Sequence, residues 1–174
     1  MTPRVLIGGV GYRWLRDASF GVVASDELTR LEWPPGVDVM DLGYGAIYAA
    51  QDIGDAEPPY DRVVLLAGVT RGREPGRVYC GQWQPTYPDA EELQERIREA
   101  GAGVIDLDHL LAIAQHFGAL PHDVVTVELE PVEAESGDGL SPEAAARLPE
   151  AIDLVRAEVL RSLVADGGRR TDDG

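Results

Sequence analysis

The stretch that decides the fold is residues 61–69, with the sequence DRVVLLAGV. It is a short and continuous run of apolar and β-branched residues, which is typical of a strand buried on both faces of a parallel sheet. A second run of this kind, residues 4–10 (RVLIGGV), lies near the start of the chain. Helical patterns alternate with these strands along the sequence. This alternation predicts a single three-layer α/β domain with a mainly parallel twisted sheet covered on both faces.

The remaining elements follow from hydrophobic spacing and from turn residues. Residues 123–132 alternate between apolar side chains and Glu128 and Glu130, which predicts a strand exposed on one face. Ser141 and Pro142 are typical of a helix start, and Pro149 is expected to kink or restart that last helix. Residues 1–165 are predicted to form the domain, and residues 166–174 a frayed polar tail. Further strands are predicted at 37–42 and 77–83, and helices at 17–31, 43–51, 93–100 and 107–117.

Charge and composition restrict the partners. The chain has 174 residues and a formal net charge of −16, so nucleic acid is excluded as a natural partner, while basic peptides, cations or another protein surface fit better. No apolar run approaches the roughly 20 residues that a membrane span needs. The first residues contain no cleavable apolar segment. We therefore expect a cytoplasmic monomer that does not bind membranes.

Missing residue types remove several mechanisms. All 15 basic residues are arginine, which excludes a Schiff-base lysine and a phosphate-binding Gly-Lys-Ser/Thr loop. The single cysteine, Cys80, excludes an internal disulfide and leaves no cluster for structural zinc. Cys80 has no histidine near it in the sequence, and Ser19 lacks the Gly-x-Ser-x-Gly context. Neither residue is predicted to be a nucleophile.

Two groups of residues are possible binding sites. Gly9 and Gly11 lie where a dinucleotide-binding loop would lie, but Trp14 occupies the position of the third glycine. We interpret this segment as a tight turn that lets the first helix approach the sheet. Asp108 and His109 lie side by side on a predicted helix and not on one face, so they are expected to be solvated. His122, before the next strand, is expected in a loop.

A series of short motifs runs through the chain in a fixed order. The segment from Gly9-Val10-Gly11 through Asp17 to Phe20-Gly21 is similar to the opening motif of the hydrogenase maturation endopeptidases, Gly-x-Gly-Asn followed by Asp-Asp/Glu-Gly-x-Gly. In place of the motif asparagine this chain has Tyr12. Further segments resemble the same family in the same order, namely 41–43, 60–65, 71–72, 75–79, 110–121, 127–131 and 139–142.

The resemblance implies the fold and the activity of that family. Its members recognise the large subunit of a nickel–iron hydrogenase through the inserted nickel, held by two carboxylates and a histidine of the protease, and then remove a C-terminal extension. Such ligands suit a borderline divalent metal. At the three corresponding positions this chain has Ala18, Ala67 and Gly103, or Val104 if the last position shifts by one. None of these side chains can bind a metal.

The resemblance with altered ligand positions leaves three interpretations. The first is a non-catalytic assembly or chaperone-like factor that engages the large-subunit precursor and has no metal of its own. The second is an active endopeptidase with relocated ligands such as Asp17, Asp106 and His109. The third is a module for small molecules or nucleotides on the same fold. Asp17, Asp41 and Asp106 are the candidates for lining the cleft, with helix capping and turn stabilisation as their alternative roles.

Overall fold

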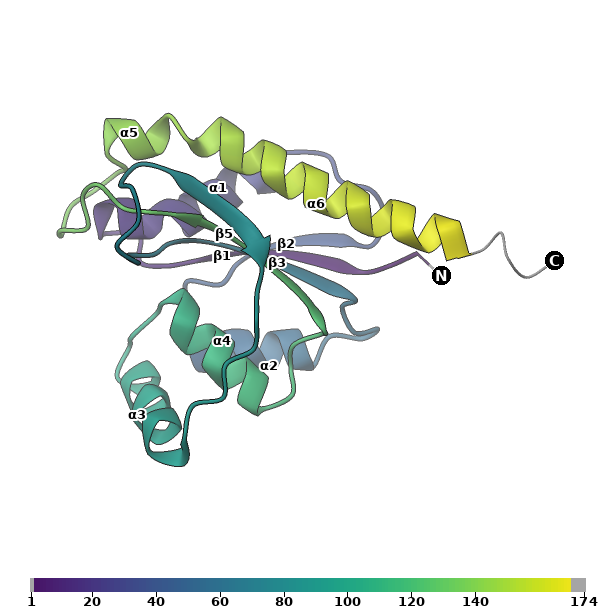
Figure 1. Ribbon diagram of the computed structural model, residues 1–174, viewed down its shortest axis with the longest axis horizontal. Helices are drawn as coiled ribbons and strands as arrows, with labels where there is room; N and C mark the ends of the chain where they lie inside the picture. Colours follow the sequence, from purple (N-terminus) through teal and green to yellow (C-terminus); the bar gives the residue numbers. More distant parts are fainter. Residues whose placement is uncertain (1, 170–174) are drawn as a thin grey trace.

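One sheet of five strands organises residues 2–169, the part of the chain that the computed structural model describes (Figure 1). The spatial order is β2-β1-β3-β5-β4. The first four strands in this order are parallel, and β4 pairs antiparallel with β5 at one edge. The predicted mainly parallel α/β sheet is therefore confirmed. The strand bounds are β1 (Val5–Val10), β2 (Val37–Asp41), β3 (Arg62–Gly68), β4 (Val78–Gln82) and β5 (Asp123–Leu129).

Helices cover both faces of the sheet, as Figure 1 shows. One layer contains α1 (Phe20–Thr29), α5 (Pro142–Ala145) and α6 (Leu148–Arg169), and the other contains α2 (Ala46–Gly54), α3 (Ala90–Gly101) and α4 (Leu107–His116). Pro149 lies in the first turn of α6, where a missing N–H breaks no helical hydrogen bond, so the last helix restarts there. The predicted tail at 166–174 begins inside α6, and residues 170–174 lie outside the described part.

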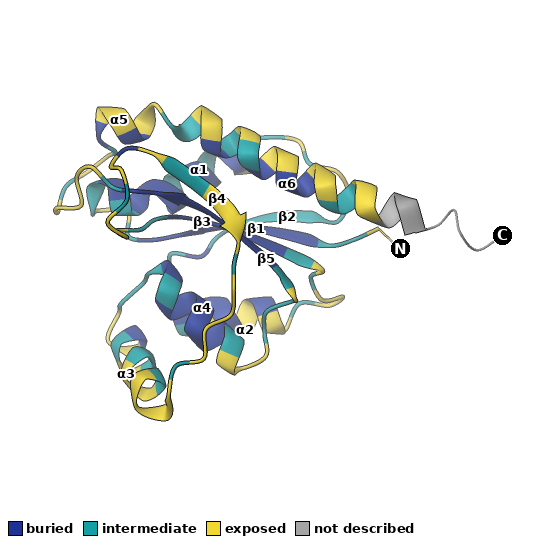
Figure 2. Ribbon diagram, in the orientation of Figure 1, coloured by how far each residue is buried: buried dark blue, intermediate teal, exposed yellow. Residues whose placement is uncertain are grey.

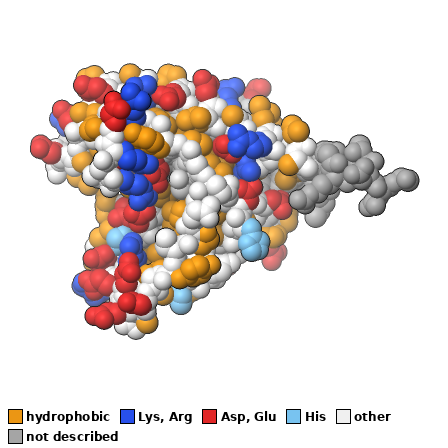
Figure 3. Space-filling model, viewed as in Figure 1, with side chains coloured by type: hydrophobic (Ala, Val, Ile, Leu, Met, Phe, Trp, Pro, Cys, Tyr) orange, Lys and Arg blue, Asp and Glu red, His pale blue; other side chains and the backbone are white. Residues whose placement is uncertain are grey.

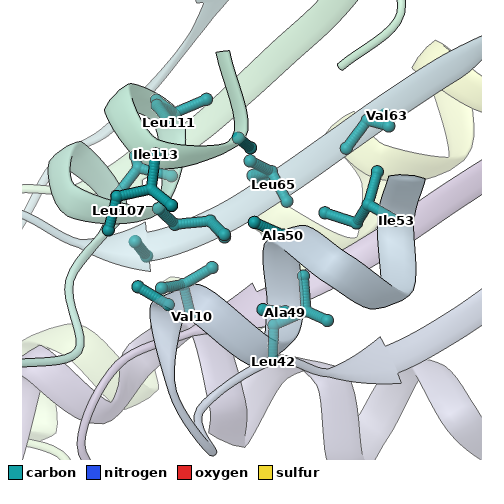
Figure 4. Packing of buried hydrophobic residues seen from close by; sticks show 14 of the residues in the cluster. Val10, Leu42, Ala49, Ala50, Ile53, Val63, Leu65, Leu107, Leu111 and Ile113 are labelled. Atoms are coloured by element: carbon teal, nitrogen blue, oxygen red, sulfur yellow. The ribbon is translucent and has the colours of Figure 1, made fainter. Parts of the chain in front are cut away.

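The strands β1, β3 and β5 are buried because each face of the sheet has its own apolar cluster (Figure 2). Successive residues of β3 point to opposite faces: Val63 and Leu65 pack against α2 and α4, whereas Val64 and Leu66 pack against α1 and α6. This two-sided burial is the reason for the continuous apolar run in the sequence. Figure 4 shows the first cluster, in which side chains of α2 and α4 meet those of β1 and β3.

The prediction that β5 is exposed on one face was wrong. Residues Val124–Leu129 are all buried, and Glu128 and Glu130 are only 6% and 3% exposed. Arg71 and Arg73, from the connection between β3 and β4, cover these two carboxylates and pair with them. The alternation of apolar and acidic residues therefore marks a strand whose carboxylates are paired with arginines and are not exposed to water.

Helix α1 touches the sheet through backbone contacts that only glycine allows. A Cβ atom on Gly21 would lie 2.0 Å from the Leu66 carbonyl oxygen and 2.6 Å from that of Val10. A Cβ on Gly9 would lie 2.2 Å from the Gly21 carbonyl oxygen. These distances confirm that Gly9 in β1 and Gly21 in α1 allow close helix–strand packing. Their place in the sequence therefore needs no nucleotide to explain it.

The contact at Gly21 generates a stability prediction. Because both clashing atoms belong to the backbone of buried strands, Gly21→Ala should lower the free energy of unfolding by about 3 kcal/mol or more. Gly81→Ala is the matched control, since Gly81 lies in exposed β4 and an added Cβ meets no atom within 4 Å. Urea unfolding followed by circular dichroism measures both. Equal stability of the two variants would contradict the packing argument.

Candidate functional site

The candidate site lies at the carboxyl edge of the sheet, between the ends of β1 and β3. The chain leaves β1 toward β2 on one side and crosses back to β3 on the other, so the strand order reverses between β1 and β3, which is where open α/β sheets form their ligand crevice. The short 3-10 turn η1 (Arg16–Ser19) packs across this crevice. A Cβ on Gly68 would lie 2.0 Å from the Asp17 carbonyl oxygen and 3.1 Å from the Ala18 Cα.

This packing brings one predicted ligand position, Ala18, close in the backbone to the strand end that carries another, Ala67. Ala67 directly precedes Gly68, pairs in register with Val10 and is 2% exposed, and Ala18 lies against Gly68. Gly103 lies in the connection between α3 and α4, is exposed, and has a φ of +104°, which L side chains rarely adopt. The assignment of these three positions as altered metal-ligand positions stays a prediction.

Tyr12 joins the two loops on either side of the crevice. Its hydroxyl donates a hydrogen bond to the Gly103 carbonyl oxygen at 2.8 Å and accepts one from the Ile105 N–H at 2.6 Å. The side chain thus extends from the connection after β1 to the connection before α4. The residue that replaces the motif asparagine therefore fixes the loop that carries Gly103.

Asp17 is a buried anchor and does not line an open cleft. The residue is 0% exposed, and its carboxylate accepts hydrogen bonds from the N–H groups of Val132, Glu133 and Ser141 and from the Ser141 hydroxyl, at 2.8–2.9 Å. Burial raises the pKa of Asp17, but the hydrogen bonds from Glu133, Ser141 and Val132 outweigh it and hold the pKa below its ordinary value. Asp17 therefore fastens the connection after β5 to the connection after β1.

The other two predicted aspartates stabilise local structure. One Asp41 oxygen accepts from the Gly43 N–H at 2.8 Å, and the other pairs with Arg13, whose guanidinium also binds Asp26. Asp106 is the N-cap of α4 and accepts from the His109 N–H at 2.8 Å. Capping and turn formation thus account for both, although Asp41 also lines a surface pocket beside Trp14.

The expectation that His109 lies on a solvated helix face was wrong. The residue is 9% exposed, and its ring nitrogens contact Asp106 at 2.8 Å and Glu99 of α3 at 2.6 Å. Burial lowers the pKa of His109, but the two carboxylates outweigh it and raise the pKa above its ordinary value. His109 ties α3 to α4. Acidic side chains crowd the part of the surface where Figure 1 places α3 (Figure 3).

Sequence reasoning missed a cluster of arginines and carboxylates on the face of the sheet that carries Ala67. Glu128 pairs in register with Ala67, and both of its oxygens are 2.8–2.9 Å from Arg71 nitrogens. Arg73 also contacts Glu128 at 2.8 Å, and Arg71 reaches Asp108 of α4 at 2.8 Å. Two glutamates in an otherwise apolar strand were the available signal, because buried carboxylates need partners.

These surroundings do not fit a metal ion. Among residues 2–169, no group of three or more His, Cys, Asp or Glu side chains could hold one. Asp17 uses its oxygens on the connection after β5, and Glu128 binds two arginines. The alternative ligand set of Asp17, Asp106 and His109 does not form such a group either: Asp106 and His109 bind each other, and Asp17 faces the Ser141 segment.

Comparison with known proteins identifies the family. A sequence model of the hydrogenase maturation protease family, HycI, matches residues 22–158. The chain belongs to this family. Most of the domain, from α1 into α6, falls within the match, so the resemblance found in the sequence motifs is confirmed.

Two curated relatives are hydrogenase expression/formation proteins. HupM of Azotobacter chroococcum is 29% identical over 160 residues, which is 90% of this chain and 71% of HupM. HoxM of Azotobacter vinelandii is 28% identical over 140 residues, which is 79% of this chain and 62% of HoxM. This chain is thus a hydrogenase maturation protease-like protein related to HupM and HoxM.

Solved structures agree on the fold. The hydrogenase 2 maturation peptidase of a Thaumarchaeota archaeon has a TM-score of 0.63 and 29% identity, with 90% of this chain and 97% of that chain covered. The hydrogenase maturating endopeptidase HybD of Escherichia coli has a TM-score of 0.68 and 22% identity, with 91% and 93% covered. Within the described residues, no helix is both long and apolar enough to cross a membrane.

The buried Asp17 carboxylate generates a pH prediction. Because its pKa is lower in the folded than in the unfolded chain, its stabilisation is complete above the unfolded value of about 3.9 and is lost as the pH falls below it. Asp17→Asn should lower the free energy of unfolding by about 3 kcal/mol at pH 7. The difference from wild type should shrink at pH 3.

Urea titrations at the two pH values measure this difference. Asp138→Asn, at an exposed aspartate of the same loop, is the control and should change stability little at either pH. A wild-type–variant difference that is the same at pH 3 and pH 7 would mean that the charge of Asp17 does not hold the loop.

Proposed function

We propose that the chain binds a nickel–iron hydrogenase large-subunit precursor in the cytoplasm as a non-catalytic assembly factor. The observation that carries the proposal is the pair Ala18 and Ala67 at the crevice between β1 and β3. The resemblance gives these positions to carboxylates that recognise the nickel of the precursor. A methyl group offers no lone pair to a metal, so recognition through nickel has no donor at either position.

The surroundings of the two alanines support the proposal. Ala67 is almost fully buried. The carboxylates nearest along the chain or the sheet are Asp17, which precedes Ala18 in the chain, and Glu128, which pairs with Ala67 across the sheet, and both already accept hydrogen bonds from protein donors. Moving either of them onto a metal would leave several buried donors without an acceptor, which costs about 1–3 kcal/mol for each group. Using either carboxylate as a relocated metal ligand would therefore cost several kcal/mol of stability, at about 1–3 kcal/mol for each unpaired donor.

The retained features favour binding over loss of function. The family fold is kept over most of the chain, and the connections after β1 and β5 are fixed by Asp17 and by a parallel bridge between Leu15 and Gly137. Relatives with hydrogenase expression and formation in their names support a role in the same process. A fixed edge with no metal donor at positions 18 and 67 suits a protein that holds the precursor and leaves its peptide bonds intact.

The precursor should be bound but not cleaved. Mixed with the nickel-loaded large-subunit precursor, the purified chain should form a complex by size-exclusion chromatography, and the C-terminal extension should stay intact by mass spectrometry. An authentic family protease acting on its own precursor is the positive control. Time-dependent shortening of the precursor by this chain would restore the endopeptidase interpretation.

The second prediction concerns the three altered positions. Ala18→Glu, Ala67→Asp and Gly103→His together should create nickel binding that calorimetry detects, whereas the wild type and each single variant should bind weakly at most. Because Gly103 has a positive φ, its substitution should cost on the order of 1 kcal/mol or more of stability.

Gly103→Ala separates this backbone cost from the metal effect. The Ala18→Glu/Ala67→Asp double variant, which keeps Gly103, tests positions 18 and 67 alone. A folded triple variant without nickel affinity would contradict the assignment of the three positions.

A further inference from the structure

We propose that a surface pocket beside Trp14 binds a partner segment in which a lysine or arginine lies next to an apolar side chain. The inference rests on the proposed function, because the partner would be the large-subunit precursor. It adds the place of contact and the chemistry of the segment. The pocket has a volume of about 550 Å³, enough for a few side chains, and it opens at the carboxyl edge of the sheet.

Trp14 has an exposed side chain in a loop whose other residues are held by hydrogen bonds, ion pairs or a β-bridge. Its neighbours are all held: Tyr12 binds the connection before α4, Arg13 binds Asp26 and Asp41, and Leu15 forms a bridge with Gly137. Trp14 itself is 68% exposed. An exposed tryptophan on a rigid loop loses little conformational entropy on binding, and tryptophan is enriched among residues that dominate interface energies.

The pocket walls combine apolar and acidic surface. The half-buried Leu15 supplies apolar surface to the lining, and Asp41 and Ser136 supply polar surface. An apolar side chain of the partner fits the apolar part of the lining, whereas a cationic group fits the part that carries Asp41. The exposed indole adds a face on which a guanidinium or ammonium group can stack, which is worth about 0.5–1 kcal/mol at exposed sites.

The surrounding charges select a basic partner. Asp41 lines the pocket, and Asp26 pairs with the lining residue Arg13. Glu133, Glu135 and Asp138 lie within three residues of the lining residue Ser136, and all five acids are at least partly exposed. The two arginines among them are already paired: Arg13 with the two aspartates and Arg16 with Glu133 at 3.9 Å. Five carboxylates against two arginines leave an excess of three negative charges. An acidic or neutral segment would gain nothing from this field.

Binding of the precursor to three variants tests the pocket. Trp14→Ala should weaken binding at least tenfold by biolayer interferometry, and Trp14→Phe should restore part of the loss. Phe117→Ala is the matched control, because Phe117 is 64% exposed at the end of α4, toward the opposite edge of the sheet. Wild-type affinity in Trp14→Ala would overturn the inference and leave the proposed function intact.

A pair of charge variants tests the chemistry of the partner. Glu135→Gln with Asp138→Asn should slow association several-fold and reduce its salt dependence. Asp55→Asn with Asp153→Asn removes the same charge from exposed positions elsewhere, at the end of α2 and on α6, and should have a smaller effect. Equal effects of the two pairs would mean that overall charge, and not the pocket, attracts the partner.

Synthetic peptides separate the pocket from the proposed function. If the wild type does not bind the precursor, the proposed function fails, and the pocket is then tested with decapeptides that alternate leucine with arginine, leucine with glutamate, or serine with arginine. A shift of tryptophan fluorescence with the leucine–arginine peptide, lost in Trp14→Phe, would support the pocket. No shift with that peptide, or an equal shift with all three, would overturn it.

Discussion

The buried carboxylate of Asp17 is the interaction on which the functional edge of this protein depends. An ionised group with no solvent exposure is stable only when every lone pair has a donor, and the connection after β5 supplies these donors from its backbone and from Ser141. The turn η1, which contains Asp17, also packs against Gly68 and includes Arg16 at a φ of +40°. One side chain thereby fixes two connections that are far apart in the sequence.

The carboxyl edge of the sheet, fixed by Asp17, has alanine at two positions where the family resemblance implies metal ligands. With alanine at positions 18 and 67, the crevice between β1 and β3 has no carboxylate to offer, and Tyr12 ties together the loops at its sides. The docking surface that we propose is instead the exposed indole of Trp14 with the acidic side chains around its pocket. A fold that positions a catalytic group in its relatives can by the same rigidity present a docking surface.

Two arginines, Arg71 and Arg73, pair with the buried carboxylates at the end of β5. Arg71 and Arg73 neutralise Glu128 and Glu130, and Arg71 also reaches Asp108 across to α4. Burial raises the pKa of Glu130, but the Arg71 N–H and Arg73 outweigh it and hold the pKa below its ordinary value. Strand β5, which contains Glu128 and is followed by Glu130, can therefore lie inside the sheet between β3 and β4.

The sequence by itself determined the α/β class, the family and the absence of ligating side chains at positions 18 and 67, because apolar runs, glycine spacing and residue identity are local properties. It could not determine that Asp17 is buried, that His109 lies between Glu99 and Asp106, or that Arg71 and Arg73 cover Glu128. Those facts depend on segments up to 124 residues apart, as in the Asp17–Ser141 contact. Only the tertiary structure brings such donors and acceptors together, and burial then decides which charges must be paired.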